Sequence, residues 1–185
     1  GYGREARLDK VLESDYNRED SVESIWRGRT MLFMDALELD MFDGGDIVPD
    51  LLPGHVEREL RKSYTAFSSK RSDGEGYAEI FTGLWGCGAF GGDWQIKTII
   101  QWCAAAMSGV NLHFICTGDK QHVFAEKLEE FTMSGLEHGW MVGDVLKALS
   151  ALDSNSADAR NAFAHIKSAL RHIDTSHANV VTKSA

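Results

Sequence analysis

The sequence has few of the residues that build disulfide frameworks, metal fingers or rigid loops. Its 185 residues include only two prolines and three cysteines, and the spacing of Cys87, Cys103 and Cys116 is irregular. Small secreted domains depend on paired cysteines, so this pattern predicts reduced thiols without a disulfide framework. The seven histidines show neither H-E-x-x-H nor Cys/His finger spacing, and we expect no metal site and no cofactor.

The sequence also lacks an apolar run long enough to span a membrane, and its net charge is not positive. The alanine-rich helical pattern is interrupted by Lys97 and is too short to span a bilayer. A formal net charge of −9 argues against direct binding to duplex nucleic acid, because affinity there comes from lysine and arginine on phosphates. It is compatible with a polyanion held in a local pocket by backbone N–H groups. We therefore expect an intracellular domain, in the nucleus or cytoplasm, with no membrane partner.

The chain is organised around residues 77–93, which read YAEIFTGLWGCGAFGGD. The β-forming residues at 80–82 lead into glycines at positions 86, 88, 91 and 92, after which a helical pattern begins. Glycines this dense after a strand let the backbone adopt positive φ and leave N–H groups uncovered by side chains. One glycine alone would indicate an ordinary turn. Four within seven positions favour a loop that cradles phosphate.

The same glycines also match a dinucleotide-binding pattern. Gly86, Gly88 and Gly91 read G-x-G-x-x-G between a predicted strand and a predicted helix, so an NAD-dependent oxidoreductase is an alternative. In that fold the pyrophosphate sits at a free helix N-terminus, but here Asp93 occupies the N-cap position, where it satisfies the N–H groups and repels an anion. Asp119, the acidic residue after the next strand, stands 28 positions beyond Gly91, where about 20 is usual. Both observations favour a ligand on the loop backbone.

Two segments before this loop carry acidic residues. The apolar run at 30–37 predicts a strand buried on both faces, and we interpret Asp35 as a cap at its end. Asp43, Asp46 and Asp50 lie in a glycine-containing connection whose spacing fits no calcium loop. They predict a solvated acidic loop.

Strand and helix patterns alternate along the rest of the chain. Apolar periodicity predicts one further strand at 111–116, and it predicts helices at 55–67, from about 93 to 107, after residue 119, at 142–152 and at 157–173. This alternation predicts an α/β fold with a mixed, largely parallel sheet, helices on both faces and additional C-terminal helices. We expect one domain over residues 1–173 and a disordered tail over 174–185.

Segment 83–93, followed by three alanines at 104–106, resembles the C-terminal half of the poly(ADP-ribose) glycohydrolase catalytic domain, which has a macrodomain-type fold. The resemblance extends back to MDAL at 34–37 and RELRKSY at 58–64, and forward to VGDVLK at 142–147, so it covers most of residues 1–150. The chain departs from the family in two respects. Leu84 stands where the family has Asn, and the family's signature loop, a glycine run followed by Gln-Glu-Glu, does not occur in this sequence.

The resemblance implies hydrolysis of the ribose–ribose O-glycosidic bonds of poly(ADP-ribose), with release of ADP-ribose, in the DNA damage response. It implies that residues 84–89 hold the diphosphate and distal ribose, that Phe90 packs against the ribose near the scissile bond, and that Tyr2 stacks on adenine. The implied substrate-binding residues are Tyr2, Leu84, Trp85, Gly86, Cys87, Gly88, Ala89 and Phe90. An alternative for Phe90 is a place in the core. Cys87 has no histidine placed by the sequence to activate it as a nucleophile.

No catalytic residue is assigned to this chain. The family uses a glutamate as general acid, in line with glycosidase chemistry, and Glu5, Glu57, Glu59 and Glu79 lie outside the family's motif. The sequence begins at Gly1 without an initiator methionine or signal segment. We therefore expect a chain break before Gly1, with the catalytic glutamates on a missing N-terminal segment that completes the domain. A non-catalytic ADP-ribose reader, with the same loop but without those glutamates, is a second alternative.

Overall fold

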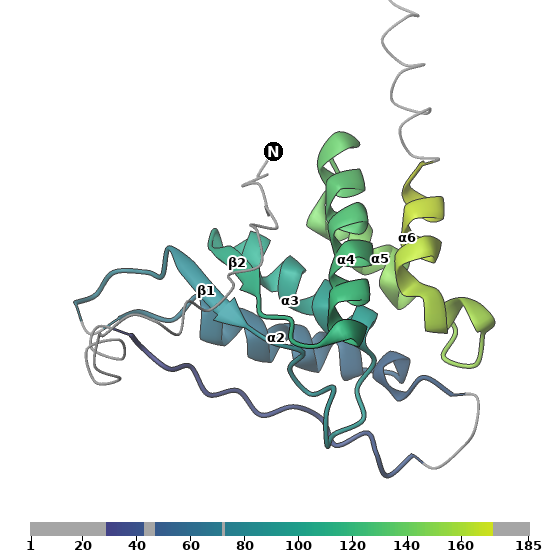
Figure 1. The fold of residues 1–185 in the computed structure, drawn as a ribbon, viewed down its shortest axis with the longest axis horizontal. Coiled ribbons are helices and arrows are strands. Elements are labelled where there is room, and N and C mark those ends of the chain that lie inside the picture. Colours follow the sequence, from purple (N-terminus) through teal and green to yellow (C-terminus); the bar gives the residue numbers. More distant parts are fainter. Residues whose placement is uncertain (1–28, 43–46, 72, 172–185) are drawn as a thin grey trace, which may run out of the picture.

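The computed structural model describes residues 29–42, 47–71 and 73–171, which form a mixed α/β architecture (Figure 1). With η for a 3-10 helix, the elements in chain order are η1 (Pro49–Leu51), α2 (His55–Phe67), β1 (Glu79–Thr82), α3 (Trp94–Ser108), β2 (Asn111–Phe114), α4 (Asp119–Glu137), α5 (Val142–Ser150), η2 (Ala157–Asn161) and α6 (Ala162–Arg171).

Strands β1 and β2 form a parallel pair connected through α3. Ile80 lies opposite Leu112, and Phe81 lies opposite His113. Parallel neighbours need a crossover connection, which α3 provides, so the three elements make a βαβ unit. Ile80 and Leu112 are buried together with Phe67 of α2 and the alanines of α3. The predicted α/β class, with parallel pairing and a helix between the strands, is confirmed.

The larger sheet with helices on both faces is not seen in the described part of the chain, where the sheet has two strands. On the face opposite Ile80, Phe81 stacks on His113 with ring centroids 4.6 Å apart, and Phe81 remains 52% exposed. Ile115 follows β2 and is 56% exposed. The predicted strand at 111–116 ends earlier, at Phe114, the last residue paired with β1, although Ile115 N still donates a hydrogen bond to Thr82 O at 2.7 Å. The apolar residues at 111–116 had predicted a strand buried on both faces, but the described residues cover only one face of β2.

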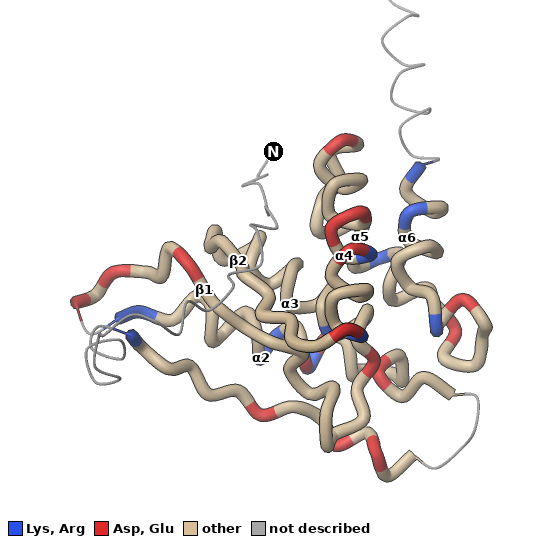
Figure 2. The backbone as a smooth tube through the Cα atoms, viewed as in Figure 1, with Lys and Arg blue, Asp and Glu red and all other residues tan. Residues whose placement is uncertain are grey.

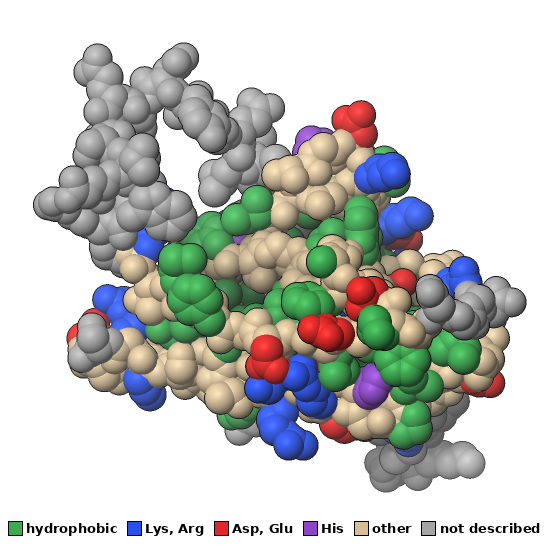
Figure 3. Space-filling model, turned by 90° about the horizontal axis from the view of Figure 1, so that it is seen from below, with side chains coloured by type: hydrophobic (Ala, Val, Ile, Leu, Met, Phe, Trp, Pro, Cys, Tyr) green, Lys and Arg blue, Asp and Glu red, His purple; other side chains and the backbone are tan. Residues whose placement is uncertain are grey.

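The predicted strand at 30–37 is wrong as secondary structure. Residues 30–39 are extended but form no strand ladder with the other described residues. Leu32 and Met34 pack on the core beside β1, whereas Met31 and Phe33 point outward with 64% and 87% of their surface exposed. Burial alternates because the described residues cover only one side of the segment. Figure 3, seen from below, shows the hydrophobic side chains that are exposed on this side of the molecule.

Helix α3 lies at the centre of the described structure. Its residues Ile96, Ile99 and Ile100 have no exposed surface, and they pack against apolar side chains of α2, α4, α5 and α6. Asp93 caps the helix, since its side chain accepts hydrogen bonds from the N–H groups of Gln95 and Ile96. Both the predicted burial of this helix and its N-cap are confirmed. A rigid, fully packed helix therefore begins directly after the glycine-rich segment.

The C-terminal helices pack around aromatic side chains. Phe131 of α4 stacks on Phe163 of α6, with ring centroids 4.5 Å apart, and Phe124 stacks on the same ring at 5.8 Å. The exposed side of α4 carries acidic residues (Figure 2), namely Glu126, Glu129, Glu130 and Glu137. The helix predicted at 157–173 begins instead as a 3-10 turn capped by Ser156, and α6 starts only at Ala162. Within the described ranges, no helix has the length and hydropathy to cross a membrane.

Candidate functional site

The glycine loop, residues 83–93, connects β1 to α3 and folds back on itself. Four backbone hydrogen bonds close its turns: Trp85 N to Gly83 O (2.9 Å), Cys87 N to Leu84 O (3.1 Å), Gly91 N to Gly88 O (3.1 Å) and Gly92 N to Gly86 O (2.9 Å). The last of these bonds joins the two ends of the loop. The loop therefore has an inner edge, at Gly86, Gly91 and Gly92, toward α3 and segment 29–42, and an outer edge, at residues 88–90, toward solvent.

On the inner edge, glycine is required by lack of space. Gly86 and Gly91 have φ of 75° and 69°, which L side chains rarely adopt. A Cβ on Gly92 would lie 2.7 Å from Cε of Lys97 and 2.8 Å from the carbonyl oxygen of Gly86. A Cβ on Gly91 would meet the backbone nitrogen of Asp40 at 3.0 Å. Three of the four predicted glycines therefore serve the internal packing of the loop.

Gly88, on the outer edge, has different surroundings. It does not have positive φ, and a Cβ built on it would meet nothing within 4 Å. Of the four predicted loop glycines, Gly86 and Gly91 have positive φ, whereas Gly88 and Gly92 do not. Within the described ranges, the backbone N–H groups of Gly88, Ala89 and Phe90 donate no hydrogen bond. Three successive N–H groups are therefore open to a ligand, and such groups favour anions.

Phe90 lies at the end of this open edge and is 40% exposed. This exposure contradicts the alternative that Phe90 is a core residue. The carbonyl oxygen of Phe90 accepts a hydrogen bond from Leu39 N at 2.8 Å. Trp85, at the other end of the loop, donates from Nε1 to the carbonyl oxygen of Met34 at 3.2 Å. Segment 29–42 therefore holds the loop at two points, while the ring of Phe90 stays accessible.

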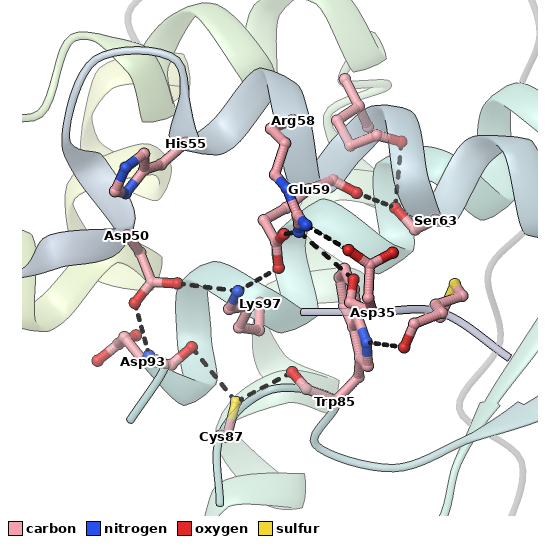
Figure 4. Close-up of polar contacts among 12 residues, drawn as sticks. Asp35, Asp50, His55, Arg58, Glu59, Ser63, Trp85, Cys87, Asp93 and Lys97 are labelled. Atoms are coloured by element: carbon pink, nitrogen blue, oxygen red, sulfur yellow. Dashed lines mark hydrogen bonds and ion pairs between the residues drawn. The ribbon is translucent and has the colours of Figure 1, made fainter. Parts of the chain in front are cut away.

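A buried lysine lies under the loop (Figure 4). Lys97 is fully buried, and its Nζ forms an ion pair with Glu59 of α2, which is 1% exposed. Nζ lies 3.4 Å from Oδ1 of Asp50 and 5.1 Å from the centroid of the Trp85 ring. A Cβ on Gly86 would lie only 3.4 Å from this nitrogen. Charges are buried in proteins only with partners, and here the partners come from η1, α2 and the loop itself.

The predicted solvation of Asp50 is wrong. Asp50 is 2% exposed, and its Oδ2 accepts a hydrogen bond from the backbone N–H of Asp93 at 2.8 Å. Burial raises the pKa of the Asp50 carboxyl above its usual range, and burial also raises the pKa of Asp93. Asp50 therefore links η1 to the start of α3. The other two aspartates of that cluster, Asp43 and Asp46, lie outside the described residues.

The ion-pair network continues to the surface through α2. Arg58 pairs with both Glu59 and Asp35, and Lys62 pairs with Asp35 at 2.6 Å. The hydrogen bond from Lys62 and the adjacent Arg58 lower the pKa of Asp35. Asp35 therefore does not cap a strand, as the sequence had suggested. It joins segment 29–42 to α2 at an exposed position, where an ion pair contributes little stability.

Cys87 lies in the loop but is not chemically activated. Its thiol contacts the carbonyl oxygens of Trp85 and Asp93 at 3.5 Å and 3.7 Å. Burial, with a further contribution from the charge of Asp50, raises the pKa of the Cys87 thiol to about 12. Nucleophilic cysteines need a lowered pKa, so this environment argues against covalent catalysis. The three cysteines are free thiols, as predicted.

The structure brings most of the predicted site residues together. Trp85, Gly86, Cys87, Gly88, Ala89 and Phe90 share the loop. Leu84 packs partly buried against the apolar core. Tyr2 lies outside the described residues.

Sequence reasoning missed the residues below the loop. Lys97 had been considered only as an interruption of an apolar helix, and Glu59 only as a glutamate outside a motif. One signal was present, because Lys97 and Gln101 are spaced i, i+4 on a largely apolar helix, which places both on one face. Gln101 is buried, accepts from the Thr82 hydroxyl at 2.7 Å and donates to the carbonyl oxygen of Gly83. This face of α3 thus supports both ends of the loop. Among the described residues, no cluster of His, Cys, Asp and Glu could hold a metal ion.

Comparison with known proteins identifies relatives of this chain. A family model described as poly(ADP-ribose) glycohydrolase, macro domain fold, matches residues 1–124. Poly(ADP-ribose) glycohydrolase 1 of Caenorhabditis elegans is 32% identical over 127 residues, which are 65% of this chain and 16% of that protein. Poly(ADP-ribose) glycohydrolase 1 of Arabidopsis thaliana is 39% identical over 66 residues, which are 36% of this chain and 12% of that protein.

A further relative, poly(ADP-ribose) glycohydrolase 2 of Caenorhabditis elegans, is 40% identical over 77 residues, or 40% of this chain and 15% of that protein. The chain thus spans 16% or less of the length of these three proteins. The family match includes the glycine loop and the ion-paired residues below it, and it ends within α4.

Proposed function

Because this chain belongs to the poly(ADP-ribose) glycohydrolase family, with its macro domain fold, we propose that it is the substrate-binding part of a domain that hydrolyses ribose–ribose O-glycosidic bonds in poly(ADP-ribose). The observation that carries this proposal is the outer edge of the glycine loop. It presents the three open N–H groups of Gly88, Ala89 and Phe90 beside an exposed aromatic ring. Such an edge suits a diphosphate next to a ribose.

The loop, and not the helix end, is the anion site in this proposal. The N–H groups at the start of α3 are already bonded to the Asp93 carboxylate, so they cannot hold a pyrophosphate as a dinucleotide fold requires. Residues 84–89 hold the diphosphate and distal ribose, Phe90 packs on the ribose near the scissile bond, and Tyr2 stacks on adenine. Leu84 contributes packing in place of the family's polar contact.

The general acid comes from another segment of the domain. Glycoside hydrolysis needs a carboxylic acid placed at the leaving oxygen. Glu59 is buried and ion-paired with Lys97 and Arg58, so its side chain is not placed to contact a substrate. Glu57 and Glu79 are exposed, on α2 and β1 respectively. We therefore place the catalytic glutamates on a segment N-terminal to Gly1.

That N-terminal segment also explains the open side of the sheet. Phe33, Phe81 and Ile115 expose large apolar side chains on or beside an extended backbone. Extended segments without partners promote association with other chains. We propose that further strands of the same domain pair here and complete a sheet with helices on both faces.

Hydrolysis by the full-length protein tests the proposal. Poly(ADP-ribose) is incubated with the protein, and release of ADP-ribose is followed by chromatography, while ADP-ribose and NAD are titrated separately by calorimetry. We expect release of ADP-ribose and preference for ADP-ribose over NAD. Binding without hydrolysis would indicate a reader of ADP-ribose, and preference for NAD would contradict the proposal.

A further inference from the structure

The glycine loop lies over three buried or half-buried carboxylates. Asp93 caps α3, while Asp50 and Glu59 are 2% and 1% exposed. Negative charges this close to an anion site in the protein interior oppose anion binding, because the interior screens charge poorly. A loop that receives a diphosphate therefore requires that these charges be compensated. We infer that Lys97 is a positioning residue for the anion site, and that its ammonium group cancels the charge of Asp50 beneath the loop.

Asp50 depends on Lys97 for a cationic partner, whereas Glu59 has a second one. Glu59 pairs with both Lys97 and Arg58, so it retains a cationic partner if Lys97 is lost. Within the described ranges, Lys97 is the one cation paired with Asp50, at 3.4 Å. The Oδ1 atom of Asp50 is buried and accepts no hydrogen bond from any described residue. Without Lys97, Asp50 would be left as an uncompensated carboxylate.

The charge of Asp50 reaches the loop. The groups that face Asp50 are Lys97 and Asp93 from α3 and its cap, with Glu59 and Arg58 of α2 one ion pair further away. His55 of α2 is turned to the carbonyl oxygen of Pro49. Burial and then the charge of Asp50 raise the pKa of the Cys87 thiol, next to Gly88, and the charge of Lys97 lowers it. The lysine stem also fills the loop, since a Cβ on Gly92 would lie 2.7 Å from Cε.

Lys97 also contacts a residue of the proposed binding site directly. Its Nζ lies over the Trp85 ring at 5.1 Å, a distance typical of a cation–π contact. The indole in turn bonds to segment 29–42 through Nε1. One ammonium group therefore connects η1, α2, α3 and the loop, and its removal changes the charge below the loop and the position of the loop at once. The two effects can be separated by removing the charge of Asp50 from a protein that lacks Lys97. Binding is then restored if the charge matters and stays weak if the position of the loop matters.

This inference rests on the proposed function, and its test is a double-mutant cycle in the full-length protein. The variants are Lys97→Met, Asp50→Asn, and the two combined. Asparagine keeps an oxygen that can accept the hydrogen bond from Asp93 N–H. The probes are ADP-ribose, inorganic pyrophosphate and uncharged adenosine, titrated by calorimetry. Lys62→Met is the matched control, because Lys62 is a lysine of the same network that pairs only with exposed Asp35 in the described structure.

We expect Lys97→Met to weaken ADP-ribose binding by about tenfold or more, as expected for an uncompensated charge near an anion. Binding of adenosine should change little. The combined variant should bind ADP-ribose within about threefold of Asp50→Asn alone. This last comparison does not need Lys97→Met to fold by itself, because the combined variant has no unpaired charge at Asp50. Lys62→Met should bind like the unchanged protein.

Three results separate the possible failures. If the combined variant binds ADP-ribose at least tenfold more weakly than Asp50→Asn, Lys97 acts by packing and the inference is wrong. If the unchanged protein binds pyrophosphate but not ADP-ribose, the proposed function is wrong. The affinities of the same variants for pyrophosphate then test the role of Lys97. If the unchanged protein binds neither anion, both proposals are overturned.

Discussion

The two edges of the glycine loop differ in what their residues contact. On the inner edge, Gly86, Gly91 and Gly92 leave no room for a Cβ. On the outer edge, Gly88 has open space around it, and its N–H group is unbonded among the described residues. A single glycine-rich motif therefore meets two requirements. The inner glycines allow the loop to close over Lys97, and the outer glycine keeps the backbone accessible.

The largest effect is expected on the inner edge. Gly92→Ala places a Cβ 2.7 Å from Cε of Lys97 and 2.8 Å from Gly86 O, so the loop or the buried ion pair must shift. We expect a loss of about 3 kcal/mol in the free energy of unfolding, measured by urea denaturation. Gly83→Ala is the control, because a Cβ there meets nothing within 4 Å. Equal stability of the two variants would show that the two parts of the loop do not differ in packing.

The inner edge should also be sensitive to pH. Burial raises the pKa of Asp50 and of Asp93 in the folded protein. The folded state then keeps these protons to higher pH than the unfolded state, so stability falls as the pH rises from about 4 through the folded-state pKa values. Asp50→Asn should flatten this fall, by about 1.4 kcal/mol for each unit of pKa shift removed. Urea unfolding from pH 4 to 7 measures it, and parallel curves for the two proteins would contradict it.

The sequence predicted the local structure well and the buried charges poorly. The start of α3 was predictable because Asp93 is an N-cap residue before an apolar pattern, and α2 because Val56, Leu60 and Phe67 recur at helical spacing. Asp50 was misjudged because aspartate in a glycine-containing connection is usually solvated, and its partner Lys97 is 47 positions away. Only the tertiary structure shows such a pairing.

The exposed side of the chain shows a related limit. A continuous apolar run at 30–37 predicts burial on both faces, and the described structure covers one. Sequence periodicity reports which residues tend to be buried, but it does not report which other segment buries them. The same reasoning applies to β2, where His113 is half-buried and Ile115, just after the strand, is exposed.

On the outer edge, Phe90→Ala should affect chemistry more than folding. The ring is 40% exposed, so its loss should cost about 1 kcal/mol of stability or less. If the ring orients the ribose for attack, kcat for hydrolysis of poly(ADP-ribose) should fall by about tenfold or more with a smaller change in ADP-ribose affinity. Steady-state kinetics and calorimetry test this. Normal turnover with a lower melting temperature would indicate a structural role.

The smallest effect is expected for Cys87, at the boundary between the edges. Its pKa of about 12 keeps the thiol protonated at neutral pH, so iodoacetamide should label it slowly in the folded protein. Cys87→Ser should change hydrolysis by about threefold at most, since the thiol is not a nucleophile. Mass spectrometry after timed labelling gives the reactivity. Rapid labelling of Cys87, together with loss of hydrolysis in Cys87→Ser, would show instead that the thiol is a nucleophile.

The distinction between the two edges is tested most directly at Gly88. In Gly88→Val, the new side chain extends into open space, where it should block approach of a diphosphate to the N–H groups of residues 88–90. The account predicts that ADP-ribose binding, measured by calorimetry on the full-length protein, is lost, while the free energy of unfolding changes by less than about 1 kcal/mol. Unchanged affinity for ADP-ribose in this variant would contradict the account.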